Sequence, residues 1–242
     1  MLKPPFPDPR PQVAQSALFQ GLPPEAMDAL CAAAAFKEVP RASYFLYQGE
    51  PATVFYILLQ GRVRLTQVTP EGHQVIVTVL GPGDGLGIIV ALSQTNYPVS
   101  AEAIEDSTAL AWTAATIQQS MLEYPQLALN GMNLLARRFV ELQDRFRELA
   151  TERVERRVAR AVLRLVRQAG KRTPEGVLID MPLSRQDLAE MTGTTLYTVS
   201  RILSDWEQKG LVSTGRERVV LRKSHELVII AEDLPEPNPT KS

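Results

Sequence analysis

The polar residues at 195–201 have the side-chain chemistry of a DNA-reading surface. Arg201 can donate two hydrogen bonds to guanine, and Tyr197 and Ser200 beside it carry hydroxyls that could reach base edges. Thr195 and Thr198 have short hydroxyls, which suit phosphate oxygens. Such a surface requires an element that presents these side chains together, and the flanking residues predict one.

Two helices joined by a glycine turn are predicted around this stretch. Ser184 and Asp187 have the spacing of a capping box, so a helix is expected to begin there. Gly193 is expected to end it, because glycine tolerates a left-handed backbone. The next helix has an apolar stripe at Val199, Ile202, Leu203 and Trp206. This pattern is typical of a helix-turn-helix, although any helical hairpin needs similar residues.

The stretch resembles the DNA-binding domain of the CRP/FNR family of bacterial transcription regulators, and TVSRIL at 198–203 is similar to the family's recognition helix. A winged-helix hairpin is expected around Gly215, with two arginines near its tip. From the resemblance and from charge, the expected phosphate contacts are Ser184, Arg185, Gln186, Thr195, Thr198, Arg216 and Arg218. The family usually has Glu at the position of Tyr197, so a different target motif is expected.

Charge is distributed unevenly along the 242 residues. The formal net charge of the whole chain is −1. Residues 1–150 contain 10 Lys and Arg against 14 Asp and Glu, a net of −4, whereas residues 151–223 contain 15 against 9, a net of +6. Basic charge therefore coincides with the predicted DNA-binding part. No nucleophile–base pair or phosphate loop is recognisable, so an enzyme is not expected.

Cys31 is the single cysteine of the chain, which excludes an internal disulfide and an iron–sulfur cluster bound by several cysteines. Its place in the apolar run MDALCAAAAF favours a core residue, while a redox sensor stays open. Neither a secretory leader nor a membrane-length apolar stretch is recognisable, so a cytoplasmic protein is expected.

Short alternating runs with glycine turns at 36–112 predict an antiparallel roll. The expected strands are 44–47, 54–59, 63–68, 75–80, 99–103 and 109–112. The segments GEPA, QGRVRL and GPGDGLG resemble the cyclic-nucleotide-binding roll of the same family. The predicted fold class is α+β: an antiparallel β-roll of cupin-like type as sensor domain, a long dimerisation helix and a C-terminal winged helix-turn-helix domain.

The roll departs from the family at the positions that hold a nucleotide. Family members that bind one have a Glu after the glycine loop and an Arg before a Ser or Thr, and Ile88 and Val99 stand there instead. No Lys or Arg occurs from Leu65 to Ala136, so a buried phosphate would lack a countercharge. The expected effector pocket is Gly87, Ile88, Ile89, Val99, Ser100 and Leu142. No cyclic nucleotide is expected; haem, on His73 or His225, stays open.

Six apolar residues in the following segment repeat at alternating spacings of three and four. They are Met132, Leu135, Phe139, Leu142, Phe146 and Leu149. Because charged residues flank them closely, the narrow seam predicts pairing with the same helix of a second chain. Leu142 and Gln143 also stand where nucleotide-binding relatives have hydroxyls on this helix.

The predicted organisation has five parts: a flexible arm at 1–17, a sensor roll at 18–124, a dimerisation helix at 125–150, a winged helix-turn-helix at 151–231 and a flexible tail at 232–242. The expected function is that of a homodimeric transcription regulator on near-palindromic DNA, with RNA polymerase as a further partner. Two alternatives stay open: a haem-dependent gas or redox sensor, and a protein-interaction module that uses the winged helix without DNA.

Overall fold

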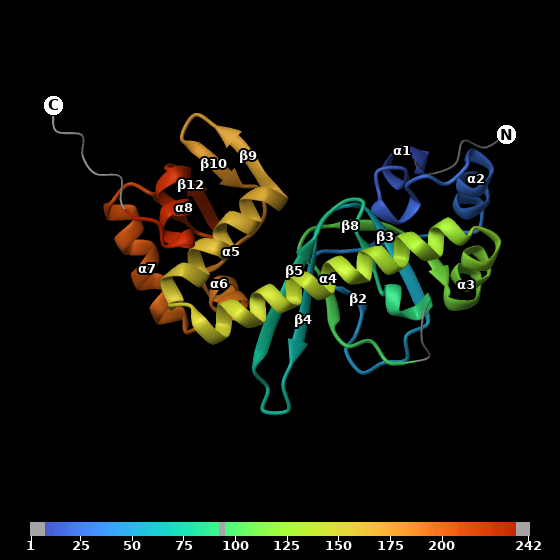
Figure 1. Ribbon diagram of the computed structural model, residues 1–242, viewed down its shortest axis with the longest axis horizontal. Coiled ribbons are helices and arrows are strands. Elements are labelled where there is room, and N and C mark those ends of the chain that lie inside the picture. Colours follow the sequence, from blue (N-terminus) through green and yellow to red (C-terminus); the bar gives the residue numbers. More distant parts are fainter. Residues whose placement is uncertain (1–7, 92–94, 236–242) are drawn as a thin grey trace. The chain divides into compact units, whose positions relative to one another are not determined.

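The computed structural model describes residues 8–91 and 95–235. The chain forms two compact units, Met1–Glu141 and Leu142–Ser242, and each is described by itself (Figure 1). The boundary between the units falls inside one long helix, α4 (Pro125–Thr151). Within the described ranges, no helix is both long and apolar enough to span a membrane.

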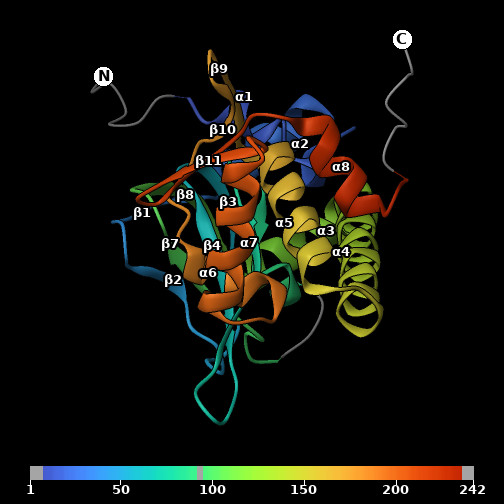
Figure 2. The same ribbon diagram turned by 90° about the vertical axis from the view of Figure 1, so that its left-hand side faces the viewer.

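Two four-stranded antiparallel sheets form the roll of the first unit, as predicted (Figures 1 and 2). One has the order β1 (Ala35–Val39), β8 (Ser107–Thr113), β3 (Val54–Gln60), β6 (Gly85–Leu86). The other has the order β2 (Tyr44–Leu46), β7 (Ser100–Ala103), β4 (Val63–Val68), β5 (Gln74–Leu80). All six expected strands are present, and β1 and β6 are additional. Successive side chains of a strand point to opposite faces, which is why alternating apolar residues indicate strands. Strand β3 departs from simple alternation, because Phe55, Tyr56, Ile57 and Leu58 are all buried.

The roll has two apolar cores on opposite sides of β3. Phe45, Tyr56 and Leu58 belong to the core inside the roll. Phe55 and Ile57, which alternate with them along β3, belong to a second core beneath the helices. These helices are α1 (Arg10–Val13), η1 (Ala17–Phe19), α2 (Pro24–Ala32), α3 (Ala114–Glu123) and the start of α4.

The prediction of a flexible arm at 1–17 has to be corrected for its second half. Val13 is fully buried in the second core, and the Ser16 side chain accepts a hydrogen bond from the Leu18 amide at the start of η1. Residues 1–7 of the predicted arm lie outside the described part of the chain. Pro9 stands at the N-cap of α1 and Pro11 in its first turn, where a helix tolerates proline.

A four-stranded sheet and four helices make up the second unit (Figure 2). The helices are α5 (Val154–Ala169), α6 (Arg185–Thr192), α7 (Leu196–Gln208) and α8 (Ser224–Glu232). The sheet has the order β11 (Val212–Gly215), β12 (Arg218–Leu221), β10 (Gly176–Ile179), β9 (Gly170–Thr173). Strand β9 is not among the elements predicted from the sequence. Its sequence GKRT is polar because β9 is an exposed edge strand.

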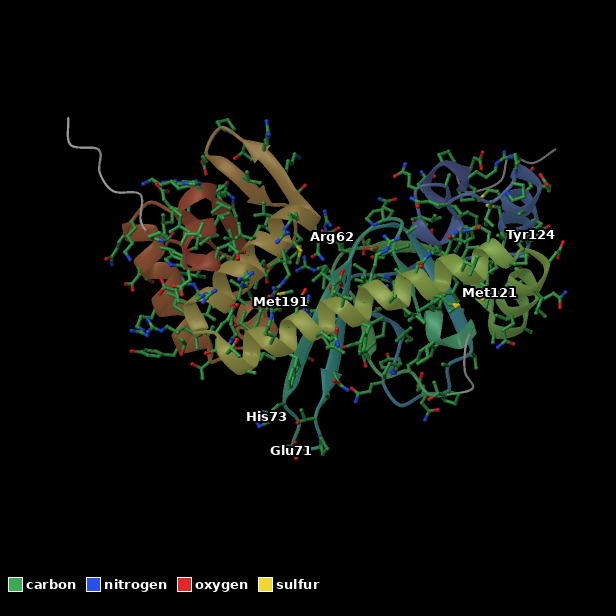
Figure 3. All side chains as sticks on the ribbon, viewed as in Figure 1. Arg62, Glu71, His73, Met121, Tyr124 and Met191 are labelled. Atoms are coloured by element: carbon green, nitrogen blue, oxygen red, sulfur yellow. The ribbon has the colours of Figure 1, made fainter. Side chains whose placement is uncertain are left out.

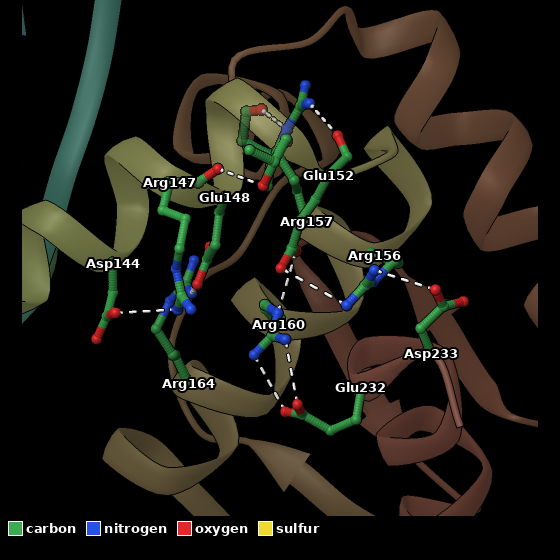
Figure 4. A network of polar contacts seen from close by, with 12 residues as sticks. Asp144, Arg147, Glu148, Glu152, Arg156, Arg157, Arg160, Arg164, Glu232 and Asp233 are labelled. Atoms are coloured by element: carbon green, nitrogen blue, oxygen red, sulfur yellow. Dashed lines mark hydrogen bonds and ion pairs between the residues drawn. The ribbon is translucent and has the colours of Figure 1, made fainter.

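Arginines of α5 pair with carboxylates on both of its helical neighbours (Figure 4). Towards α4, Arg164 contacts Glu148 at 2.8 Å and Arg160 contacts Glu152 at 3.1 Å. Towards α8, Arg160 also contacts Glu232 at 3.0 Å, and Arg156 contacts Asp233 at 3.3 Å. Glu232 and Asp233 thus belong to the folded unit, although they fall in the predicted tail, whose residues 236–242 lie outside the described ranges.

Candidate functional site

The helix-turn-helix has the local geometry that its sequence predicts. The Asp187 amide donates to Ser184 Oγ at 3.0 Å, and the Ser184 amide donates to Asp187 Oδ2 at 2.8 Å, which completes the capping box. Gly193 adopts the left-handed conformation at φ 61° and ψ 46° and ends α6. Thr195 caps α7 by accepting from the Thr198 amide. Backbone groups at both helix starts are therefore satisfied locally.

Helix α7 presents its predicted base-reading side chains outward. Val199, Leu203 and Trp206 are fully buried, which fixes the opposite face towards solvent. Tyr197 is 78% exposed, Arg201 is exposed, and Ser200 is partly exposed. Residues three and four apart share a helix face, so all three lie on one surface. A helix with such a face can enter the major groove of DNA.

The wing is a β11–β12 hairpin with a two-residue turn at Arg216 and Glu217. Gly215, expected at the turn, is instead the last residue of β11 and pairs with Arg218. Glu217 adopts φ 52°, a conformation that few residues other than glycine take readily. The wing therefore places Arg216 at its exposed tip, where a side chain can reach a phosphate.

Two of the arginines among the predicted phosphate contacts have side-chain partners within the protein. Arg185 Nη2 donates to Thr214 Oγ1 at 3.3 Å, which links the start of α6 to the wing. Arg218 Nη2 pairs with Glu175 Oε2 at 3.3 Å, and both side chains are about half exposed. An exposed pair of this kind is weak, so Arg218 can exchange it for a phosphate. Ser184, Arg185, Gln186, Thr195, Thr198 and Arg216 are all exposed or partly exposed.

Most of the predicted seam on α4 is an exposed apolar stripe. The exposed fractions are 61% for Met132, 60% for Phe139, 58% for Leu142, 73% for Phe146 and 52% for Leu149. Leu129 and Val140, which the sequence reasoning omitted, are 53% and 55% exposed. Apolar side chains exposed at this density along one helix are typical of a surface that another chain covers.

Leu135 differs from the other five members of the seam. It packs against the second core of the first unit, so the regular spacing assigned it to the wrong surface. Gly131 lies one turn before Leu135, and a Cβ placed on it would lie 3.7 Å from Leu18 Cδ1 and 3.8 Å from Ile88 Cδ1 of the same core. Residues four apart share a helix face, so Leu135 faces the core as Gly131 does. At the same end of α4, Asn130 Nδ2 donates to the carbonyls of Leu18 at 2.9 Å and Gln20 at 2.8 Å.

Two predicted effector-pocket residues of the roll, Ile88 and Val99, belong to different cores. Ile88 is 3% exposed and belongs to the second core, whereas Val99 packs against the core inside the roll. Ser100 Oγ accepts from the Gln48 amide at 2.9 Å. A Cβ placed on Gly87 would lie 2.9 Å from the Val54 carbonyl oxygen, so this glycine permits a close backbone approach. Leu142 belongs to the second unit and is exposed, and Ile89 is partly buried.

Arg138 is a cation at the glycine loop that the sequence reasoning missed. Its Nη2 donates to the Gly85 carbonyl at 2.7 Å, and burial lowers the pKa of Arg138, while Asp84 and Glu141 act in the opposite direction. The cation-free span in the sequence therefore does not make the roll free of buried cations. The missed signal is the position of Arg138 three residues after Leu135, on the same helix face.

Neither histidine lies in a setting that fits haem. His73 follows the turn between β4 and β5 and is exposed (Figure 3), and His225 is exposed near the start of α8. A haem ligand on the protein would need an apolar pocket around it. In the described ranges, no group of three His, Cys, Asp or Glu side chains could hold a metal ion. Cys31 packs against the second core as predicted, and burial raises the pKa of its thiol.

Comparisons with known families match both units. Residues 36–124 match the cyclic nucleotide-binding domain, and residues 156–228 match the Crp-like helix-turn-helix domain. The first range covers the roll, and the second runs from α5 to α8. These matches agree with the antiparallel roll and with the helix-turn-helix that the capping box and Gly193 indicate.

Similar proteins are known over nearly the whole chain. The cyclic AMP receptor protein of Thermus thermophilus is 32% identical over 216 residues, which covers 89% of this chain and 97% of that protein. The CRP-like cAMP-activated global transcriptional regulator of Mycobacterium tuberculosis is 24% identical over 215 residues, with coverages of 89% and 96%. Among solved structures, FixK2 of Bradyrhizobium japonicum superposes with a TM-score of 0.72 at 25% identity, covering 81% of this chain and 96% of that one.

Proposed function

This chain belongs to the CRP/FNR family of DNA-binding transcription regulators, and we propose that it acts as a homodimer on a near-palindromic DNA site. The observation that carries the proposal is the exposed apolar stripe of α4. In water its side chains, which include two phenylalanines more than half exposed, would be unfavourable unless covered. A second copy offers the same stripe, so one twofold axis can cover both.

We further propose that Arg201, Tyr197 and Ser200 contact bases, while the wing and the start of α6 contact phosphates. The support is the outward face of α7, together with Arg216 at the tip of the wing and Arg185 at the start of α6. With two chains about an axis, the recognition helices would lie about 34 Å apart, so half-sites about ten base pairs apart are expected.

A cyclic nucleotide is not the effector in this proposal, although two of the similar proteins are named for cyclic AMP. Two observations support this. Ile88 is an apolar residue inside a core, where it cannot accept a hydrogen bond from a ribose hydroxyl. Val99 likewise cannot provide a cation for a phosphate. Arg138 of α4 is a half-buried cation at the glycine loop, and its guanidinium already donates to the Gly85 carbonyl.

RNA polymerase is the further partner that we propose, because a transcription regulator on DNA acts by contacting the polymerase or by excluding it. Action on bacterial DNA would also place the protein in the cytoplasm. Haem and other cofactors form no part of the proposal, since the exposed positions of His73 and His225 do not support a haem ligand.

Selection of binding sites from random duplex DNA, followed by gel shifts at several salt concentrations, tests the DNA part of the proposal. The expected result is a near-palindromic site whose affinity falls steeply with salt, because basic side chains displace counterions from phosphates. Failure to enrich any sequence, with no salt-dependent shift, would leave the alternative of a protein-interaction module. Calorimetry with cyclic AMP tests the effector part: no binding tighter than about millimolar is expected, and micromolar binding would overturn it.

A further inference from the structure

Arg157, near the start of α5, connects two helix ends of the second unit. Its Nε donates to the Thr192 carbonyl at 3.0 Å, and its Nη2 reaches the Gly193 carbonyl at 3.5 Å. Its Nη1 donates to the Glu152 carbonyl at 2.9 Å. Figure 4 shows this guanidinium beside the ion pairs of α5, but its three acceptors are backbone atoms.

These carbonyls lie where two helices leave backbone acceptors unpaired. Helix α4 ends at Thr151, one residue before Glu152, and helix α6 ends at Thr192. The last carbonyls of a helix receive no hydrogen bond from amides within that helix. The same ends carry partial negative charge from the helix dipole, which favours a cation. One planar guanidinium can serve all three acceptors because its donors point in a fixed fork, which a lysine ammonium lacks. Arg157 thereby joins the end of α6 to the end of α4.

The ends of α4 and α6 are also in direct contact. A Cβ placed on Gly193 would lie 3.0 Å from Leu149 Cδ2, so the last residue of the apolar stripe packs over the turn of the helix-turn-helix. Helix α7 is joined to the first turn of α5, because Trp206 Nε1 donates to Glu155 Oε1 at 3.0 Å. The stripe residues Leu142–Leu149 and the base-reading face of α7 therefore belong to one packed unit.

We propose that Arg157 is a positioning residue for DNA recognition, which fixes α6 and α7 relative to the end of α4 and thereby sets the spacing of half-sites that a dimer accepts. The inference rests on the proposed homodimer. Pairing along the stripe would fix α4 relative to the twofold axis, and Arg157 would then fix each recognition helix relative to α4. Inserting one base pair moves a half-site by about 3.4 Å along the DNA, so a loosened joint should widen the accepted spacings.

The test compares wild type with Arg157→Lys and Arg157→Ala. Arg167→Lys is the matched control, because Arg167 lies on the same helix and its Nε donates to Leu163 O of that helix. The probes are a duplex with one selected half-site and a series of palindromes whose half-site spacing varies by up to two base pairs. Fluorescence anisotropy gives the Kd for each duplex, and circular dichroism with sedimentation checks folding and dimerisation. Arg157→Lys keeps a cation at the site if Arg157→Ala fails to fold.

Wild type and Arg167→Lys are expected to prefer one spacing. For the Arg157 variants, the preference for that spacing over its neighbours should fall by about tenfold, while single half-site affinity changes less than about twofold. Equal loss on every duplex, or an unchanged spacing preference in folded Arg157→Lys, would overturn the positioning role. If wild type itself shows no spacing preference or does not dimerise, the proposed homodimer fails, and the inference fails with it.

Discussion

Replacement of Phe146 by Glu should dissociate the proposed dimer. Phe146 is 73% exposed, and a buried aromatic side chain removes about 150–250 Å² from water, so roughly 110–180 Å² is available for a partner to cover. At about 25 cal/mol per Å², full coverage would contribute roughly 3 to 4 kcal/mol per protomer. The twofold axis doubles this figure. If only half the area is covered, about 3 kcal/mol per dimer remains, which corresponds to a Kd raised about a hundredfold.

Sedimentation velocity over a range of protein concentrations measures this change. Leu122→Glu is the matched control, because Leu122 is 78% exposed on α3 and lies outside the stripe, so the same charge is introduced at a comparable apolar site. Leu135 is unsuitable for substitution, since its burial against the second core would mix loss of folding with loss of dimerisation. A Phe146→Glu protein that dimerises as tightly as wild type would refute the assignment of the stripe to the interface.

Three further substitutions test other parts of the second unit. Arg201→Ala should cost about 1 to 3 kcal/mol per half-site and relax the preference at one base position in a selected pool, whereas equal loss on all sequences would assign Arg201 to the backbone. Arg185→Ala should weaken binding to all DNA sequences alike. It should also make the slope of the logarithm of the binding constant against the logarithm of the salt concentration shallower by about one unit, and an unchanged slope would contradict a phosphate contact. Glu148→Ala should lower the free energy of unfolding, measured by urea titration, by about 2 to 3 kcal/mol, because the largely buried Arg164 loses two hydrogen bonds. This figure allows for the 25% exposure of the Arg164 side chain, which weakens the pair by solvent screening. A loss below about 0.5 kcal/mol would show that the pair is not stabilising.

Features fixed by neighbours in sequence were predictable from the residues. The capping box of Ser184 and Asp187 and the left-handed Gly193 depend on residues three positions apart and on one backbone conformation. The six roll strands were predicted from alternation over four to six residues. Strand β9 was missed because an edge strand needs no apolar face, and Lys171 and Arg172 looked like loop residues.

Two features were not predictable from local patterns. One is which face of α4 is buried, and the other is in which of the two cores Ile88 and Val99 lie. The spacing of the α4 seam fits Leu135 as well as Phe139, but Leu135 shares a helix face with Gly131, which lies against Leu18 and Ile88 of the second core. Likewise Ile88 and Val99 were grouped because the family resemblance grouped them, whereas β3 separates their two cores. Both outcomes depend on long-range contacts that no local pattern contains.

The boundary between the two units divides α4, so its last turns belong to the same unit as the helix-turn-helix. Helix α4 ends at Thr151, one residue beyond the predicted end of the dimerisation helix at 150. The end of α4 nevertheless stays connected to α5 by ion pairs, because Glu148 pairs with Arg164 and Glu152 pairs with Arg160. The last turns of α4 therefore belong with the winged helix-turn-helix, on the far side of the boundary at 141 and 142. Chains that pair through Leu142, Phe146 and Leu149 would therefore pair their DNA-reading units directly.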